Sequence, residues 1–175
     1  NGHAITRNAN VNLFQFTAAA SLKFQNTTFK KGSSASNSTG YSTFYLQVAN
    51  SKLTLENCTS TDYNTLYLGQ NSTATIKSGT YSGNYFAYTN SGNLNVEDVT
   101  FSNIYLVYNN NGNLNIESGI FSNYVYTNSG TINVEGGVFS GSYFVNFNYK
   151  DINIHDGTFK NTSNVVNNNG NSGSH

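Results

Sequence analysis

The sequence has few of the residues on which many functional sites depend. Its 175 residues include one cysteine, Cys58, which excludes a disulfide framework and a metal site built from several thiolates. Only 9% of the residues are charged, eight basic and eight acidic, and Arg7 is the one arginine. Because a surface that neutralises phosphates needs clustered lysine and arginine, we expect no nucleic-acid partner.

Proline, methionine and tryptophan are absent. The chain starts at Asn1 without a methionine, so we expect a processed product or a segment of a longer polypeptide. It shows no signal peptide and no apolar run long enough to span a bilayer, which predicts no membrane insertion.

The clearest feature that is present is an internal repeat of about 20 residues, in about seven copies. Two copies read SGNLNVEDVTFSN (91–103) and NGNLNIESGIFSN (111–123). Each unit begins with an apolar marker residue, and a second apolar residue follows two positions later. The markers are Leu22, Leu53, Ala74, Leu94, Leu114, Ile132 and Ile152. Seven positions after the marker, six of the seven units have an aromatic residue: Phe29, Tyr81, Phe101, Phe121, Phe139 and Phe159.

The alternation of apolar and polar residues within each unit predicts short strands, and no segment shows a helical stripe. Such a unit cannot bury its apolar side alone, so each strand must pair in parallel with its copies in the neighbouring units. We therefore predict an all-β fold, a right-handed parallel β-helix (β-solenoid) of about seven turns. It forms one domain over residues 1–168, with an inserted loop at about 32–40 and a polar tail at 169–175.

The repeat resembles known β-helix sequences, most clearly in the copy LNIESGIFSN (114–123). It looks like the repeats of the right-handed parallel β-helices of the pectin-lyase-like superfold. It is also similar to repeats of bacterial surface adhesins, polymorphic outer-membrane proteins and protist surface proteins. The resemblance implies the fold and carries little information about function.

Each unit also contains a second apolar segment before the next turn, as in YFAYT (85–89) and YLVYN (105–109). Both sets of alternate positions in these segments are apolar, and we expect only one set to point inward. The other set would form an outer stripe larger than monomers usually expose, which predicts a packing partner. That partner would be another solenoid, another part of the polypeptide, or a saccharide. The candidate stripe residues are Tyr67, Phe86, Tyr88, Tyr105, Tyr108, Tyr124, Tyr126 and Tyr143.

A column of carboxylates lies three positions after the markers, with Glu97, Glu117 and Glu135 expected one above another at about 5 Å. Like charges this close are relieved by a cation, so these residues are candidate Ca²⁺ ligands. The alternative is a solvated edge whose ends are neutralised by Lys77 and His155. We expect no other cofactor.

Two outward columns of short polar side chains flank the markers, including Asn95, Asn115, Asn133 and Asn153. Asparagine ladders stabilise stacked strands through mutual hydrogen bonds, and a water-ordering or ice-binding face is the alternative interpretation. The candidate N-glycosylation sites are Asn26, Asn37, Asn57, Asn71 and Asn161.

No pair of carboxylates is expected to converge on one bond, and no nucleophile–base pair is evident, so we expect no enzymatic activity. The leading hypothesis is a secreted, extracellular or cell-surface structural solenoid that self-associates or packs against neighbouring coat proteins in a filament, coat or stalk. The alternatives are an adhesin or carbohydrate-binding module, a polysaccharide lyase or hydrolase, and an ice-binding protein.

Overall fold

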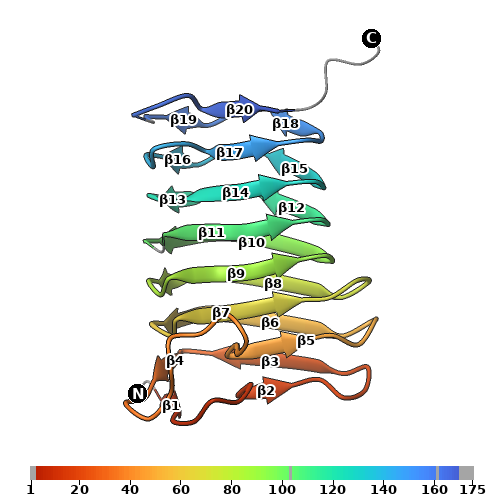
Figure 1. The fold of residues 1–175 in the computed structure, drawn as a ribbon, viewed down its shortest axis with the longest axis vertical. Coiled ribbons are helices and arrows are strands. Elements are labelled where there is room, and N and C mark those ends of the chain that lie inside the picture. Colours follow the sequence, from red (N-terminus) through yellow and green to blue (C-terminus); the bar gives the residue numbers. More distant parts are fainter. Residues whose placement is uncertain (1–2, 103, 161, 170–175) are drawn as a thin grey trace.

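A computed structural model describes residues 3–102, 104–160 and 162–169. Within these residues the fold is all-β without a helix, and parallel strands stack into a β-solenoid of about eight turns that are about 20 residues apart (Figure 1). The turns lie one above another, with two sheets running along the coil. The prediction of a parallel β-solenoid is confirmed.

The first sheet contains twelve strands among the described residues. Its main path comprises β1 (His3–Arg7), β4 (Thr27–Lys31), β6 (Lys52–Ser60), β8 (Thr73–Tyr81), β10 (Asn93–Phe101), β12 (Asn113–Ile116), β15 (Thr131–Val134) and β18 (Ile152–Ile154). Beside this path lie β3 (Ser21–Gln25), β13 (Gly119–Phe121), β16 (Val138–Phe139) and β19 (Thr158–Phe159).

The second sheet contains eight strands among the described residues. In order they are β2 (Phe14–Gln15), β5 (Phe44–Leu46), β7 (Asn64–Leu68), β9 (Tyr85–Asn90), β11 (Tyr105–Asn110), β14 (Tyr124–Asn128), β17 (Val145–Asn148) and β20 (Val166–Asn168). Every strand pair in both sheets is parallel, because each turn places its copy of a strand directly on the previous one.

The strand register follows the columns read from the sequence. Leu22 pairs with Leu53, and each later marker pairs with the next one, as far as Ile132 with Ile152. The structure has about eight turns rather than seven, because β1 adds a strand that the markers did not include. In that strand Ile5 pairs with Phe29 of the aromatic column.

The aromatic column forms one side of the core. Phe101, Phe121 and Phe139 are fully buried, with ring centroids 5.5 and 4.8 Å apart in successive contacts. Ser60 interrupts the column, and its hydroxyl lies 2.8 Å from that of Thr65 inside the core. This hydrogen bond satisfies two polar groups that would otherwise be buried without partners.

Some of the second apolar segments turn two neighbouring residues into the core, against the expected choice between two registers. Phe86 and Ala87 are consecutive in β9, and both are fully buried. Leu106 and Val107 behave in the same way in β11. The pairing of β7 with β9 shifts register within these strands, and such an irregularity re-aims side chains so that two neighbours face the core. The expectation that only one set points inward is wrong for β9 and β11, whereas β7 buries Leu66 and Leu68 and leaves Tyr67 between them at the surface.

Irregular positions in the first sheet, between β3 and β4 and within β6 and β10, need left-handed backbone conformations. Asn26, Asn57 and Asp98 adopt φ of 52°, 50° and 48°, and asparagine and aspartate tolerate this region better than other side chains. In later turns glycine takes over the positive φ, for example Gly119 at 138°. The asparagines and glycines that punctuate the repeat therefore have a backbone role.

Candidate interaction surface on the second sheet

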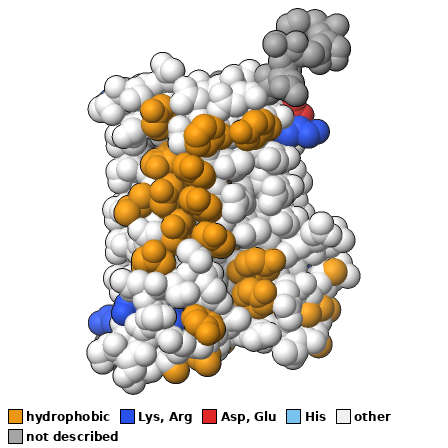
Figure 2. All heavy atoms as spheres, in the orientation of Figure 1, with side chains coloured by type: hydrophobic (Ala, Val, Ile, Leu, Met, Phe, Trp, Pro, Cys, Tyr) orange, Lys and Arg blue, Asp and Glu red, His pale blue; other side chains and the backbone are white. Residues whose placement is uncertain are grey.

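The outward side of the second sheet carries two neighbouring columns of aromatic side chains, here called the tyrosine face. The first column is Tyr85, Tyr105, Tyr124 and Tyr143, and the second is Tyr88, Tyr108, Tyr126 and Phe147. All eight side chains are half-buried. Figure 2 shows apolar side chains gathered along this side of the coil, over the strands that Figure 1 labels β9 to β17.

Several rings of the tyrosine face stack in parallel from turn to turn. Tyr88 and Tyr108 have ring centroids 5.2 Å apart and planes 6° apart, and Tyr108 and Tyr126 lie 4.7 Å and 2° apart. In the first column Tyr85 and Tyr105 lie 5.0 Å and 8° apart. The parallel strands produce this stacking, because they set equivalent side chains one turn above another.

The two columns also contact each other. Tyr105 meets Tyr108 edge to face at 5.2 Å, and Tyr85 meets Tyr88 at 5.3 Å. Edge-to-face contacts of this kind add stabilisation beyond the area that the rings bury. The face therefore consists of rings that hold one another in place.

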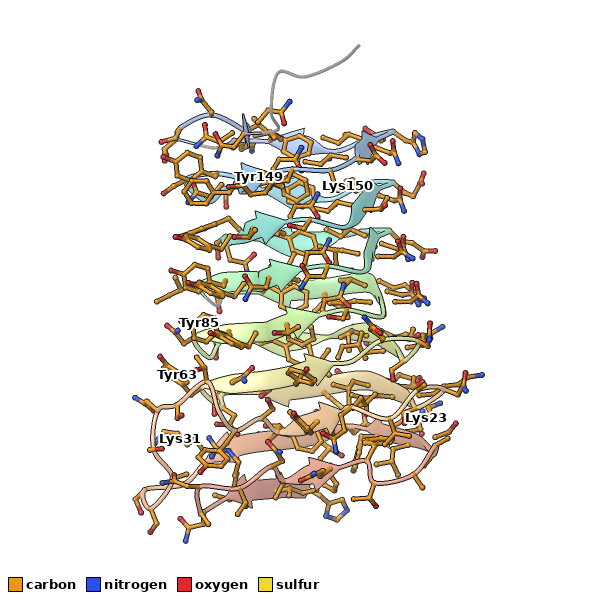
Figure 3. All side chains as sticks on the ribbon, turned by 45° about the vertical axis from the view of Figure 1, so that its right-hand side comes forward. Lys23, Lys31, Tyr63, Tyr85, Tyr149 and Lys150 are labelled. Atoms are coloured by element: carbon orange, nitrogen blue, oxygen red, sulfur yellow. The ribbon has the colours of Figure 1, made fainter. Side chains whose placement is uncertain are left out.

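The aromatic surface extends into the earlier turns. Tyr45 and Tyr67 stack at 4.4 Å, and Tyr63 contacts Tyr85 at 5.6 Å. Figure 3 shows Tyr63 and Tyr85 on one edge of the coil and Lys23 on the opposite edge. The strands of the second sheet contain no Lys, Arg, His, Asp or Glu, so this sheet is free of formal charge.

The packing of the rings decides which atoms face the solvent. Parallel rings at 4.7 to 5.2 Å must overlap with an offset, since carbon atoms in contact lie about 3.5–4.0 Å apart. Each ring therefore covers part of its neighbour's face. This stacking therefore leaves less open ring face at the surface than separate rings would.

The same crowding raises the pKa of three phenols of this face. Burial, together with the neighbouring phenols of Tyr63 and Tyr105, raises the pKa of Tyr85 to about 12. Burial and the adjacent Tyr126 raise the pKa of Tyr108, and burial raises that of Tyr124. The cause in each case is that a phenolate would lose hydration and would lie beside other phenols.

One candidate residue does not belong to this surface. Phe86 is fully buried in the core, so the prediction that it lies in the outer stripe is wrong. The shift in register turns Phe86 inward while Tyr85 and Tyr88 on either side stay outside. The other seven candidates are half-buried at the surface: Tyr67, Tyr88, Tyr105, Tyr108, Tyr124, Tyr126 and Tyr143.

The carboxylate column lies at the edge of the first sheet. Lys77 pairs with Glu97 at 3.3 Å, and His155 lies 2.9 Å from Glu135, so basic groups do stand at both ends of the column. The described residues include no group of three or more His, Cys, Asp or Glu side chains that could hold a metal ion. Calcium binding by Glu97, Glu117 and Glu135 stays a prediction.

One further carboxylate at this edge has a perturbed pKa. The hydrogen bonds from Lys23 and Gln25 hold the pKa of Glu56 below its usual range, and the side chain is exposed to solvent. The Lys23–Glu56 pair at 2.8 Å is a surface ion pair, so it contributes little to stability.

The outward asparagine ladder is confirmed. Asn115 donates to Asn95, Asn133 donates to Asn115, and Asn153 donates to Asn133, each at 2.8 Å. Because the amides hydrogen-bond to one another, they have fewer free groups with which to order water. Ice binding by this face gains no support from that arrangement.

A second asparagine ladder is buried and was missed from the sequence. Asn90 donates to Asn110 at 2.7 Å, Asn110 to Asn128 at 2.7 Å, and Asn128 to Asn148 at 2.8 Å. Asn90 also accepts from the backbone of Gly92, which holds the turn into the next strand. The signal was present, because each of these asparagines stands four positions before a marker.

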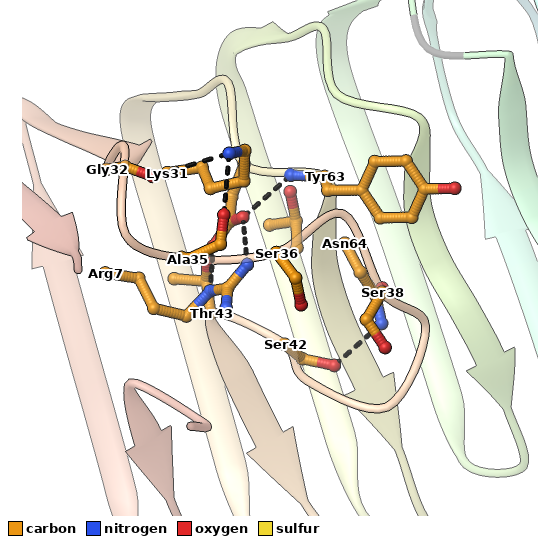
Figure 4. Close-up of polar contacts among 12 residues, drawn as sticks. Arg7, Lys31, Gly32, Ala35, Ser36, Ser38, Ser42, Thr43, Tyr63 and Asn64 are labelled. Carbon is orange, nitrogen blue, oxygen red and sulfur yellow. Dashed lines mark hydrogen bonds and ion pairs between the residues drawn. The ribbon is translucent and has the colours of Figure 1, made fainter. Parts of the chain in front are cut away.

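The single arginine has a structural role that the sequence did not reveal. Arg7 is 1% exposed and donates from Nε and Nη2 to the two carboxylate oxygens of Asp62, both at 2.7 Å. Thr43, between the inserted loop and β5, donates to the same carboxylate at 2.9 Å. Figure 4 shows Arg7 and Thr43 close together beside this loop. The pair therefore ties β1 and the loop to the third turn of the chain.

All the candidate glycosylation sites in the described part of the chain are exposed, namely Asn26, Asn37, Asn57 and Asn71. Asn161 lies outside the described residues. Three of them, Asn26, Asn57 and Asn71, have positive φ, so the backbone by itself accounts for asparagine at these positions. Glycosylation of the sequons stays a prediction.

Comparisons with known proteins add no family to this picture. No protein-family model, no curated protein and no solved structure matches the chain. In the described part of the chain, no helix is long and apolar enough to cross a membrane. The structure establishes the parallel β-solenoid. The resemblance to pectin-lyase-like or adhesin repeats rests on the sequence motif alone.

Proposed function

We propose that the protein is a non-enzymatic structural β-solenoid, secreted or at the cell surface, that self-associates laterally through its tyrosine face. The observation that carries this proposal is the combination of two aromatic columns with a sheet that has no charged side chain. Aromatic residues are enriched and charged residues are depleted at the centres of protein interfaces.

A second copy of the same chain is the partner that this face suits best. A face without charge offers nothing to attract a charged partner, and it does not repel an identical face. Twofold symmetry is the commonest symmetry of soluble oligomers, and two copies related by a twofold axis would bring the same columns together. Tyrosine suits such a contact because it offers apolar area and a polar hydroxyl.

The ring geometry weighs against the saccharide-binding alternative. Sugar rings stack on open aromatic faces, and here Tyr88, Tyr108 and Tyr126 cover one another's faces in part. The site chemistry also supports a non-enzymatic role. Both carboxylate oxygens of Asp62 accept hydrogen bonds from Arg7, and the Glu135–His155 contact is exposed to solvent.

Sedimentation velocity from micromolar to near-millimolar concentration tests this proposal. The wild-type chain is expected to form dimers or larger assemblies as the concentration rises. The double substitution of Tyr105→Thr and Tyr108→Thr is expected to keep the chain monomeric, since threonine retains strand propensity without the ring.

The matched control changes the opposite side of the coil. Asn95→Thr with Asn115→Thr also places two threonines on outward strand positions, and it should self-associate like the wild type. A wild-type chain that stays monomeric throughout, or a control that dissociates as readily as the tyrosine variant, would overturn the proposal.

A further inference from the structure

The parallel-stacked tyrosines bring reactive ring carbons of neighbouring turns together. Strands β11 and β14 pair Val107 with Val125 and Asn109 with Thr127, so Tyr108 and Tyr126 occupy equivalent positions between these pairs. Their rings, 4.7 Å and 2° apart, therefore point the same way from the sheet. Equivalent positions and nearly parallel planes bring the ortho carbon (Cε) of one ring near the equivalent carbon of the next ring.

The composition makes tyrosine the preferred target of a one-electron oxidant. The chain has no tryptophan and no methionine, and its single thiol, Cys58, is fully buried. The tyrosine face, by contrast, is partly open to solvent along several turns (Figure 2). No other readily oxidised side chain competes with the phenols at this surface.

We propose that the tyrosine face is an oxidative cross-linking site, at which Tyr88–Tyr108, Tyr108–Tyr126 and Tyr85–Tyr105 couple to dityrosine between turns. The oxidant is hydrogen peroxide activated by a haem peroxidase. This inference does not depend on lateral association, because the coupled residues belong to one chain.

The reaction balances with one peroxide for each cross-link. Each of two phenols loses one electron and its hydroxyl proton, and hydrogen peroxide takes up the two electrons and two protons to form two waters. The two phenoxyl radicals join through their ortho carbons, the Cε atoms beside the carbon that bears the oxygen, which forms one carbon–carbon bond. Each coupled carbon then gives up its hydrogen to the oxygen of its own ring, and both phenols are restored.

The structure predicts which pairs react. The parallel pairs lie 4.7 to 5.2 Å apart with planes within 8° of each other. Tyr124 and Tyr143 lie 6.2 Å apart with planes at 68°, so their rings are farther apart and not parallel. This pair serves as a negative control within the same column.

The glutamates of the chain allow the cross-links to be mapped. Cleavage after Glu56, Glu97, Glu117 and Glu135 yields the peptides 98–117 and 118–135, with 57–97 and 136–175 on either side. The experiment treats the dilute wild-type chain with peroxidase and hydrogen peroxide, digests it at glutamate, and identifies linked peptides by tandem mass spectrometry. Dityrosine fluorescence reports the total yield.

The expected products are 57–97 linked to 98–117 and 98–117 linked to 118–135, within monomeric chains. Tyr108→Phe keeps a ring in place, so its fold should be unchanged. This variant should reduce the link between 98–117 and 118–135 to the level of a urea-denatured sample. It should retain the link between 57–97 and 98–117 through Tyr85 and Tyr105.

Three results would overturn the inference. They are the absence of dityrosine in the folded chain, the same distribution of links in folded and denatured samples, and cross-linking that occurs only between chains at high dilution. The failure of lateral self-association would leave these readouts unchanged, so the two proposals are tested separately.

Discussion

At the scale of single residues, the buried Arg7–Asp62 pair holds the first turns of the coil together. The guanidinium and the carboxylate are both buried, and the two hydrogen bonds between them are 2.7 Å long. A buried charge is tolerated only when it is paired and hydrogen-bonded. The backbone amide of Tyr63 and the hydroxyl of Thr43 supply the remaining donors to Asp62.

Asp62→Asn is expected to lower the free energy of unfolding of the first turns by about 3–5 kcal/mol, because it leaves the Arg7 guanidinium buried without a countercharge. Hydrogen exchange of the β1 amides, together with urea denaturation, measures this loss. Asp98→Asn is the matched control, since Asp98 is exposed and asparagine accepts its positive φ. Equal effects of the two substitutions would contradict the role given to the pair.

At the scale of the strand and its turn, the two asparagine ladders look alike and differ in burial. The outer ladder through Asn115 is partly open to water, so a lost hydrogen bond there is replaced by solvent. The inner ladder through Asn110 is fully buried, and Asn110 also donates weakly to the carbonyl of Thr131 at 3.4 Å. A buried amide that loses its partner cannot form a replacement hydrogen bond with water.

Asn110→Ala is therefore expected to destabilise the chain by about 2–3 kcal/mol, because Asn90 and Asn128 each lose a buried partner. Asn115→Ala removes the same amide from the outer ladder and should cost less than about 1 kcal/mol. Urea denaturation midpoints of the two variants give the comparison. If Asn115→Ala is the more damaging substitution, the inner ladder does not hold the turns as described.

At the scale of the whole molecule, the coil has a polar outer side on the first sheet and an aromatic one on the second. Three phenols of the tyrosine face, in three successive turns, have a raised pKa. They are Tyr85, Tyr108 and Tyr124, and burial is the first cause in each case, since the phenolate would be poorly hydrated. Stability at alkaline pH therefore depends on this face.

The folded chain is expected to lose stability between about pH 10 and pH 12. A tyrosine in the unfolded chain ionises at about pH 10, and the pKa of Tyr85 in the folded chain is about 12, so the unfolded state binds fewer protons in this window. The stabilisation is complete below pH 10 and disappears as the pH rises through 12.

Melting temperatures at pH 8, 10 and 11.5, with absorbance at 295 nm to follow tyrosinate, measure this dependence. Tyr85→Phe with Tyr108→Phe removes two of the shifted groups and keeps the rings, so its alkaline loss should be smaller than that of the wild type. The lysines are the same in both chains, so they do not contribute to the difference. An identical pH profile for both chains would refute the assignment.

The sequence alone was sufficient for the fold class and for the register of the first sheet. The markers from Leu22 to Ile152 are spaced by one turn, and parallel stacking of identical units is the arrangement that buries them. The outer asparagine ladder through Asn95 and Asn115 followed from the same alignment. Local periodicity determines these features, so they need no knowledge of distant contacts.

Only the tertiary structure decided where the periodicity breaks. The irregularity in the second sheet puts Phe86 and Ala87 both into the core, and no alternation of residues signals such a bend. Arg7 and Asp62 are 55 positions apart and meet because the coil and the inserted loop enclose them. A repeated pattern specifies what every turn has in common, whereas contacts that occur once depend on how the turns are placed in space.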